Sequence, residues 1–277
     1  MMNHRVVRMM MGLVSLAAGC SSTANAGSTE HTQCSIPTAL APSSSPHWTY
    51  KDGDEPPAAW GTLSGDELCG TGRNQTPINI VTAAATTGAS RPHFAGYGKI
   101  PLVIEHNGHT IEVEYTARND GSDPRFDFGG KTYVLVQFHL HSPSEHTVDG
   151  ASHAGELHMV HKASDGSMAV VGVFLDEGAF NSELGKVIGN APPASRTTTC
   201  ANAQIDLAAL VPRTGTLWSY AGSLTTPPCA EGVTWFVSGT PRTFSTAQRA
   251  DFVSRTAPVT NRPIQGLNGR TINKIVQ

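Results

Sequence analysis

The sequence predicts a β-rich fold, mainly β with a few short helices, in one large domain. From Trp48 onward, short apolar or alternating runs are separated by glycine, proline, asparagine and aspartate, a pattern typical of many short strands joined by turns. Hydrophobic residues make up 39% of the 277 residues, which is enough for one large core. Nothing in the composition requires a second folded domain.

Seven runs are expected to be strands because β-branched, aromatic or alternating residues fill them. In chain order they are Leu102–Glu105, Thr110–Tyr115, Tyr133–His141, Gly155–Lys162, Met168–Leu175, Trp218–Ala221 and Val233–Ser238. Two short helices are also expected. One runs from Asn181 to about Ile188, and the other covers Ser245–Arg255, where Ser245 can act as the N-cap.

The first 26 residues are interpreted as an export signal. Arg5 and Arg8 precede a short apolar stretch, Met9–Ala18. We expect cleavage after Ala24-Asn25-Ala26, which would release a soluble product to the periplasm or the medium. The alternative is a lipoprotein signal over residues 1–19, because Ala17-Ala18-Gly19-Cys20 resembles a lipoprotein box, and Cys20 would then carry a membrane lipid anchor.

A polar stretch rich in serine, threonine and proline follows, and residues 27–46 are expected to be a flexible linker before a folded domain over residues 47–277. The formal charge of −3, with no basic run beyond the N-terminus, argues against nucleic acid as a partner. Export also makes the cysteines informative. Besides Cys20, four remain (Cys34, Cys69, Cys200 and Cys229), and the residues alone do not choose among their three pairings.

Three histidines on two neighbouring predicted strands point to a metal site. Side chains alternate along a strand, so Gln137, His139 and His141 share one face of the run that ends at His141. In the next run, Glu156 and His158 share a face. If the two runs pair, three imidazoles converge. Three neutral imidazoles without a fourth protein ligand match a catalytic Zn²⁺ site that leaves one position to water.

Two polar residues in phase with the histidines strengthen this interpretation. Gln137 precedes His139 by two residues, and Glu156 precedes His158 by two. Metal-bound histidines usually donate their second ring N–H to an amide, carboxylate or carbonyl, which is the role expected of Gln137 and Glu156. A lone His-x-His would be explained equally well as a solvated pair, but the third histidine and both supporting residues favour a metal site.

Several separated motifs resemble those of the α-class carbonic anhydrases of bacterial type, from about His47 to the end of the chain. They are His47-Trp48-Thr49-Tyr50, Gln75-Thr76-Pro77-Ile78-Asn79-Ile80, Asn107-Gly108-His109, Phe138-His139-Leu140-His141, Ser144-Glu145-His146, Glu156-Leu157-His158-Met159-Val160-His161 and Ser223-Leu224-Thr225-Thr226-Pro227-Pro228-Cys229. The resemblance implies a large, mostly antiparallel, twisted central sheet of about ten strands. It also implies reversible hydration of CO2 to bicarbonate and a proton, by attack of a zinc-bound hydroxide.

The resemblance extends to individual residues. His109 fills the position of a proton shuttle, and Thr225 that of a gatekeeper whose hydroxyl donates to Glu145. The substrate-facing residues implied are Val160, Val170, Leu224 and Trp235, together with Thr225 and Thr226. Tyr50 is implied as a hydrogen-bonding residue at the edge of the site, and the backbone near Asn268 as the partner of His141. A disulfide between Cys69 and Cys229 is favoured, with Cys34 and Cys200 as a second pair or as free thiols.

One departure and two rival interpretations remain open. Glu112 stands where the family often has a neutral amide, and a carboxylate there could alter the water chain or raise the pKa of His109. His139-x-His141-x-x-x-Glu145 superficially fits a cupin-like iron or manganese site, but Tyr133 stands where that family expects glycine. A non-catalytic, partner-binding relative of carbonic anhydrase would have lost a zinc ligand, whereas all three histidines are present. A homodimer is also left open.

Overall fold

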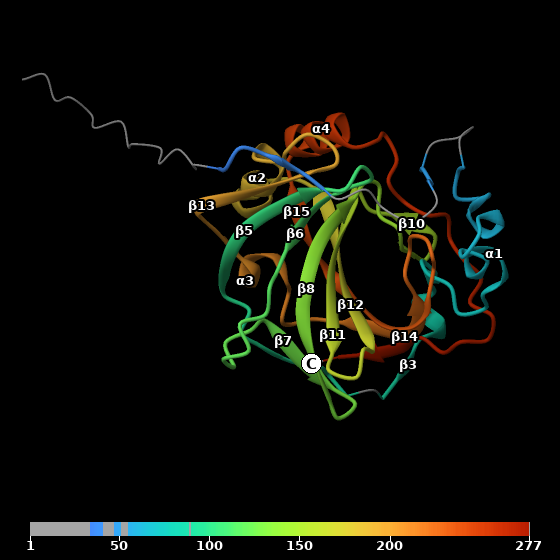
Figure 1. Cartoon of the computed structure of the whole chain (residues 1–277). Coiled ribbons are helices and arrows are strands. Elements are labelled where there is room, and N and C mark those ends of the chain that lie inside the picture. Colours follow the sequence, from blue (N-terminus) through green and yellow to red (C-terminus); the bar gives the residue numbers. More distant parts are fainter. Residues whose placement is uncertain (1–33, 41–46, 51–54, 89, 277) are drawn as a thin grey trace, which may run out of the picture. The chain divides into compact units, whose positions relative to one another are not determined.

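The computed structural model describes residues 34–40, 47–50, 55–88 and 90–276, and strands dominate this part of the chain (Figure 1). The strands are β1 (Thr38–Ala39), β2 (Asn79–Ile80), β3 (Thr86–Thr87), β4 (His93–Ala95), β5 (Lys99–His106), β6 (Ile111–Glu114), β7 (Arg125–Phe128), β8 (Lys131–His141), β9 (Thr147–Val148), β10 (Ala151–Ser152), β11 (Gly155–Ala163), β12 (Met168–Glu177), β13 (Arg196–Asp206), β14 (Leu217–Ser223), β15 (Glu231–Phe244) and β16 (Asn273–Ile275). The helices are α1 (Leu68–Thr71), α2 (Ser182–Gly189), α3 (Leu207–Leu210) and α4 (Thr246–Arg255), with 3-10 turns η1 (Trp60–Thr62) and η2 (Thr82–Ala84).

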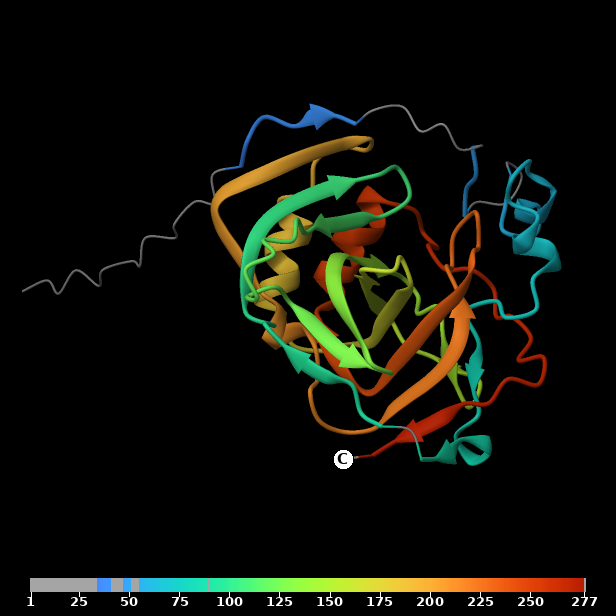
Figure 2. The same cartoon turned by 60° about the horizontal axis from the view of Figure 1, so that its bottom comes forward.

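One sheet of 13 strands organises the described residues, and its strands can be followed in Figure 2. Its order is β1-β13-β5-β6-β8-β11-β12-β15-β14-β16-β3, with β7 beside β8 and β4 beside β7. Within this sheet the pairs β12–β15 and β16–β3 are parallel, and the other pairs are antiparallel. The predicted fold class is confirmed, and each of the seven predicted strands is present. The sheet has more strands than the expected ten because several two- and three-residue strands extend its edges.

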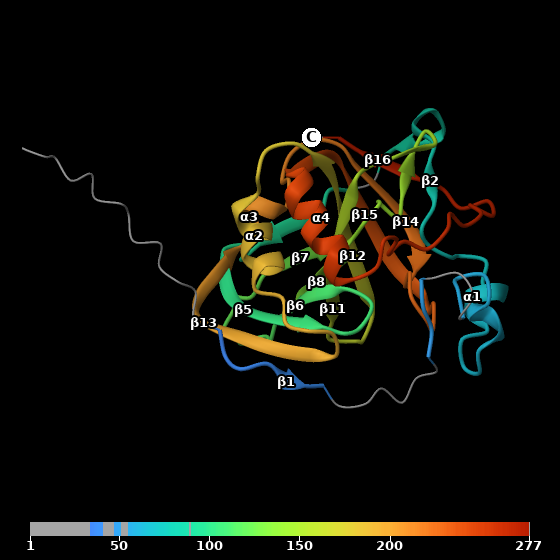
Figure 3. The same cartoon turned by 90° about the horizontal axis from the view of Figure 1, so that it is seen from above.

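The two faces of the central strands have different chemistry. On β8 and β11, the side chains of Phe138, Leu140, Leu157 and Met159 enter the main apolar core. Helices α2 and α4 contribute Leu184, Val187 and Phe252 to the same core, and Figure 3 shows these two helices close together. His139, His141 and His158 alternate with these apolar residues and therefore face the other way, whereas His161 of β11 lies on the core side beside Tyr97 and Phe126.

A bulge in β8 changes which residues face the core. The pairing of β8 with β11 shifts between Val160 and His161, so that Gln137 pairs with Val160 but Leu135 with His161. An extra residue in one strand reverses the alternation beyond it. Strict alternation along this strand predicts that Val136 lies on the same face as Phe138 and Leu140. That prediction is wrong, because Val136 is only half-buried and Leu135, at 2% exposed, enters the core instead.

The two predicted helices are confirmed, and Ser245 caps the second one as predicted. The Asn181 side chain accepts hydrogen bonds from the backbone N–H groups of Glu183 and Leu184 at the start of α2. Ser245 and Gln248 form a reciprocal capping box at the start of α4. Within the described ranges, no helix has the length and apolar character needed to cross a bilayer.

Part of the predicted linker, residues 27–46, is attached to the sheet. Residues Cys34–Leu40 lie along the sheet edge, where β1 pairs with β13 and Cys34 forms a disulfide with Cys200 (Figure 3). The linker prediction for residues 27–46 is therefore wrong for this stretch, because backbone pairing and a covalent bond both attach it. The implied Cys69–Cys229 disulfide is also present. The signal segment and Cys20 lie outside the described residues.

A buried histidine makes the stability of the fold depend on pH. The imidazole of His161 is fully buried, and its Nε2 accepts a hydrogen bond from the hydroxyl of Tyr97. Burial lowers the pKa of His161 from 6.5 to about 3. The unfolded chain binds a proton here below about pH 6.5, and the folded protein does so only near pH 3. The free energy of unfolding therefore falls as the pH drops through this window.

We predict that His161→Leu reduces this pH dependence. Between about pH 7 and pH 5, the His161 contribution should cost the wild type about 2 kcal/mol of stability that the variant does not lose. The test is urea denaturation of both proteins at the two pH values. Loss of the Tyr97 hydrogen bond lowers the stability of the variant at both pH values alike, so the comparison is between slopes. Equal slopes would contradict the prediction.

Candidate metal centre

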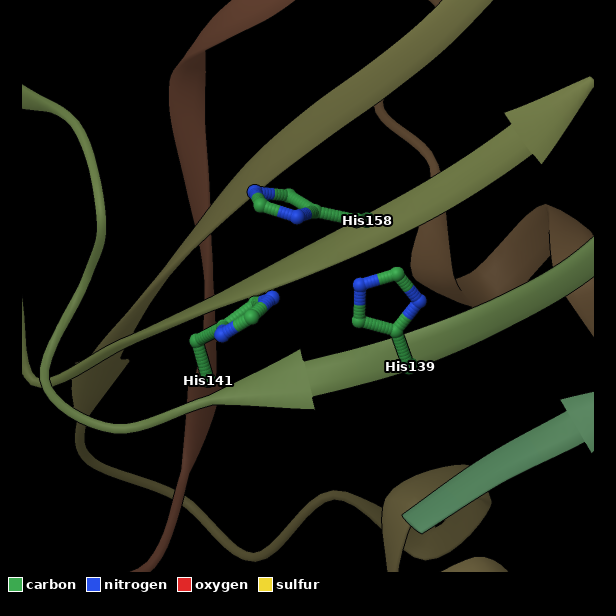
Figure 4. Close-up of side chains that lie close together, drawn as sticks. All are labelled: His139, His141 and His158. Atoms are coloured by element: carbon green, nitrogen blue, oxygen red, sulfur yellow. The ribbon is translucent and has the colours of Figure 1, made fainter. Parts of the chain in front are cut away.

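The register of β8 and β11 brings three imidazoles together. His139 lies opposite His158, and His141 lies opposite Glu156. One ring nitrogen from each histidine lies within 4.8 Å of the others. Figure 4 shows the three rings turned toward a common point from the two strands. This convergence is the one predicted from the alternation of side chains.

Two of the three imidazoles are held by the residues predicted to support them. His139 Nδ1 donates to Gln137 Oε1 at 2.7 Å, and His158 Nε2 donates to Glu156 Oε1 at 3.0 Å. Each bond places the ring proton on the nitrogen that faces the protein. The remaining nitrogens, Nε2 of His139 and Nδ1 of His158, therefore carry their lone pairs toward the centre.

The support of His141 comes from a residue that the sequence did not indicate. His141 Nδ1 donates to the carbonyl oxygen of Thr260. The expectation that the backbone near Asn268 does this is wrong, because Asn268 directs its side-chain amide to the carbonyl of Arg73. Thr260 is brought to His141 by two bonds to Ser142, from the Thr260 N–H to the Ser142 carbonyl and from the Ser142 N–H to Thr260 Oγ1.

Glu156 is a buried carboxylate with four donors. Besides His158, its oxygens accept from His146 Nδ1 at 2.8 Å and from the backbone N–H groups of Glu145 and His146. Burial opposes ionisation, but His146 and His158 together hold the pKa of Glu156 well below its usual value. Gly172 leaves space for the Glu156 carboxylate, because a Cβ at this position would lie 2.8 Å from Glu156 Oε1.

The polar atoms around the centre fit a bound zinc ion. His141 Nε2 and Glu145 Oε2 are buried and have no hydrogen-bond partner among the residues described. Leaving such atoms without a partner is costly unless a further group binds there. Burial lowers the pKa values of His139 and His141, which favours the neutral form that binds metals. The pKa of His158 is raised, because Glu156 and Glu145 outweigh the effect of burial there, so zinc would displace a proton from this ring on binding. Three neutral nitrogen donors are a donor set typical of catalytic zinc.

Comparison with known proteins gives a consistent answer. Residues 55–276 match the model of the eukaryotic-type carbonic anhydrase family. A carbonic anhydrase of Klebsiella pneumoniae is 42% identical over 227 residues, which are 82% of this chain and 90% of that protein. The chain belongs to the α-carbonic anhydrase family.

Solved structures agree with this assignment. The α-carbonic anhydrase of Thermovibrio ammonificans in complex with the inhibitor sulfanilamide has a TM-score of 0.75 at 36% identity, covering 82% of this chain and 98% of that one. The α-carbonic anhydrase of Photobacterium profundum has a TM-score of 0.74 at 35% identity, covering 82% and 99%. The chain is thus a carbonic anhydrase enzyme, and the cupin-like and non-catalytic alternatives are set aside.

In this carbonic anhydrase the expected hydrogen bond between Thr225 and Glu145 is not formed. Glu145 Oε1 accepts from the backbone N–H of Arg262 at 2.8 Å, and Oε2 lies 3.6 Å from His141 Nε2 and 3.7 Å from His158 Nδ1. The carboxylate is thus turned toward the imidazoles. Thr225 is buried in the loop that the Cys69–Cys229 disulfide ties down, and its gatekeeper role stays a prediction.

The residues expected to form an apolar wall lie together beside His158. Val160 on β11 pairs with Val170 on β12, which pairs with Trp235 on β15. Leu224 packs against the same cluster, and the Trp235 ring centroid lies 4.8 Å from that of His158. Strand order thus assembles this wall from three strands and one loop.

The shuttle candidate has an aromatic neighbour. The imidazole of His109 stacks on Trp48, with ring centroids 3.6 Å apart and planes within 9°. Burial, and to a smaller extent His47 and His106, lowers the pKa of His109 to about 4. The expectation that Glu112 raises this pKa is wrong, because burial is the largest effect and lowers it. Tyr50 lies at the edge of the site, its ring centroid 6.5 Å from that of His141.

Besides Thr260, sequence reasoning missed Arg262, which holds Glu145 in place beside the three histidines. Its backbone positions Glu145, while its buried guanidinium donates to Gln75 Oε1 and to the carbonyls of Thr76 and Cys69, each at 2.8 Å. It therefore connects Glu145 to the disulfide-bonded segment. Arg262 stands in a run without periodicity, and nothing in its local pattern marks it as buried.

We predict that His158→Ala weakens zinc binding by more than the 10- to 100-fold typical of losing a supporting residue, because a direct ligand is removed. The matched control is His153→Ala, which removes a half-buried histidine bonded to Asp176 just before β11. Competition with a chelator measures both affinities. Unchanged zinc affinity in His158→Ala would show that this histidine is not a ligand.

Proposed function

We propose that this enzyme catalyses the reversible hydration of CO2 to bicarbonate and a proton, with Zn²⁺ held by His139, His141 and His158. The observation that carries the proposal is the convergence of three ring nitrogens within 4.8 Å, in a chain of the carbonic anhydrase family. When bound, zinc polarises a water molecule and lowers its pKa toward neutrality, for which carbonic anhydrase itself is the standard example.

The residues around the three histidines fix the tautomer and the orientation of each imidazole ring. Gln137, Glu156 and the carbonyl of Thr260 each accept the proton of a different histidine. With zinc bound, each imidazole would keep only the proton that it donates to its supporting residue and would bind the ion as a neutral ligand. Three neutral ligands would leave the positive charge of the ion available for catalysis. Losing one supporting acceptor would free a ring to rotate or to change tautomer.

The polar and apolar sides of the site have different tasks. The wall of Val160, Val170, Leu224 and Trp235 suits CO2, which is apolar and would gain nothing from a charged subsite. The hydroxyl of Thr225, with Thr226 beside it, is proposed to orient the water or hydroxide that attacks CO2. Orientation of reacting groups is a large contribution to rate. Glu145 would accept a hydrogen bond from the Thr225 hydroxyl once its carboxylate turns away from the imidazoles.

Proton release is assigned to His109, which we expect to be a weak proton acceptor. A histidine with a pKa near 4 is neutral at pH 7, so it can accept a proton, but it is a weak acceptor for a donor that titrates near 7. The ring stacks on Trp48 and is half-buried, so part of it is exposed to solvent. Exchange with dissolved buffer should then contribute strongly to turnover.

The proposed function predicts CO2 hydration by the zinc-loaded wild type and near-total loss of it in His158→Ala. Stopped-flow measurement with a pH indicator follows the reaction directly. His153→Ala is the control and should keep the wild-type rate. A zinc-loaded wild type that leaves CO2 at the uncatalysed rate, or a fully active His158→Ala, would contradict the proposal.

For His109→Ala we predict a loss in kcat smaller than the about 100-fold that marks an effective general acid or base. The reason is the lowered pKa of His109, which already limits the transfer. Added imidazole should raise kcat of the variant to the wild-type level and should accelerate the wild type as well. A loss of several hundredfold that imidazole fails to restore would refute this account of proton release.

Export is proposed from the disulfides. The bonds Cys34–Cys200 and Cys69–Cys229 are typical of an oxidising compartment such as the periplasm or the extracellular space. Cleavage after Ala26 and the alternative lipid anchor at Cys20 concern residues outside the described ranges, and both stay predictions. The same holds for a homodimer.

A further inference from the structure

Glu112 lies directly behind the metal ligand His139. It is on β6, where its Cα pairs with that of His139 on β8, and it is only 8% exposed. Its two carboxylate oxygens have different partners. Oε1 accepts from Asn107 Nδ2 at 2.9 Å, and Oε2 accepts from Gln137 Nε2 at 2.8 Å.

The bond to Gln137 determines which end of that amide faces His139. An amide has a donor end and an acceptor end, and a carboxylate only accepts. With Glu112 binding Gln137 Nε2, the amide presents Oε1 to the Nδ1–H of His139, at 2.7 Å. A half-turn of the amide would place two donors against each other at His139 and would also leave Glu112 facing an oxygen.

The side-chain amide of Asn107, the other partner of Glu112, also has a fixed orientation. Asn107 Oδ1 accepts the backbone N–H groups of His109 and Thr110, each at 2.9 Å, in the turn between β5 and β6. The amide nitrogen of Asn107 must therefore point at Glu112. Two donors of fixed direction thus point at one side chain, and the carboxylate of Glu112 offers each of them an acceptor oxygen of its own.

We propose that Glu112 is a positioning residue for the zinc ligand His139, acting through the amide of Gln137. The inference rests on the proposed zinc site. Glu112 holds Gln137 so that His139 keeps its proton on Nδ1 and its Nε2 lone pair toward the ion. The same carboxylate joins this ligand to the turn that carries His109.

The neighbouring acidic residues provide a matched control. Carboxylate oxygens of Glu105, Glu112 and Glu114 lie within 4.8 Å of one another. Glu114 is on the same face of β6, but among the described residues no side-chain hydrogen bond connects it to Gln137 or Asn107. Glu114→Gln therefore removes one negative charge from the cluster while leaving the bonds of both amides in place.

The experiment measures zinc affinity and zinc release by chelator competition in wild type, Glu112→Gln and Glu114→Gln. Burial, with Glu114 and Glu105, raises the pKa of Glu112 to about 8, so we would work at about pH 9, where the carboxylate is ionised. Glu112→Gln should bind zinc about 10- to 100-fold more weakly, in the range typical of supporting residues. Glu114→Gln should match the wild type. Equal weakening in both variants would indicate a charge effect and overturn the proposal.

A double-mutant cycle tests the route through Gln137. In the background of Gln137→Ala, adding Glu112→Gln should cause no further loss of zinc affinity, because the connecting amide is already absent. Additive losses would overturn the proposal. If the wild type fails to bind zinc, the proposed metal site itself is refuted. If the wild type and Glu112→Gln both bind zinc with equal affinity, only the positioning role is refuted.

A measurement on the unaltered chain covers the case in which Glu112→Gln does not fold. In zinc-loaded wild type, one side-chain amide proton of Gln137 should resonate downfield and exchange slowly with water, since it is buried against a carboxylate. Gln137→Ala assigns the signal by its disappearance. Two freely exchanging amide protons at ordinary shifts would overturn the proposal.

Discussion

The antiparallel register of β8 against β11 is the constraint on which the site depends. In this register His139 faces His158 across the strands, and the supporting residues fall on the same side as the ligands they hold. A slip by one residue would turn His158 into the core and Leu157 or Met159 toward the site. Each such apolar side chain contributes about 1.5–3 kcal/mol through burial, so the main core indirectly holds the metal ligands in place.

The second constraint is the cost of buried polar groups. Glu156 is fully buried and stable as a carboxylate only because two imidazoles and two backbone amides surround it. Arg262 is buried on similar terms, with its guanidinium bound by one amide oxygen and two carbonyls. Each group is satisfied only while the loops around β8 and β11 keep their places. The same contacts that make these burials tolerable therefore make the geometry of the histidines rigid.

Local patterns predicted the parts of the protein that depend on local physics. Alternation within β8 and β11 was enough to place the three histidines, and local helical signals, with Ser245 as a cap in the second helix, were enough to place α2 and α4. What failed depends on contacts between distant segments. β13 is rich in threonine and lacks apolar alternation, and it is a strand because β5 and β1 flank it. Thr260 reaches His141 from 119 residues away, which no periodicity can reveal.

The most direct test of the central claim is a crystal structure of the zinc-loaded protein. Glu145 Oε2 lies near two of the donor nitrogens, so the geometry must show whether this carboxylate binds the ion. The account predicts three nitrogens, Nε2 of His139 and His141 and Nδ1 of His158, at about 2.0–2.1 Å from zinc, with the fourth position open to solvent. Coordination by Glu145, or by fewer than three of these histidines, would contradict it.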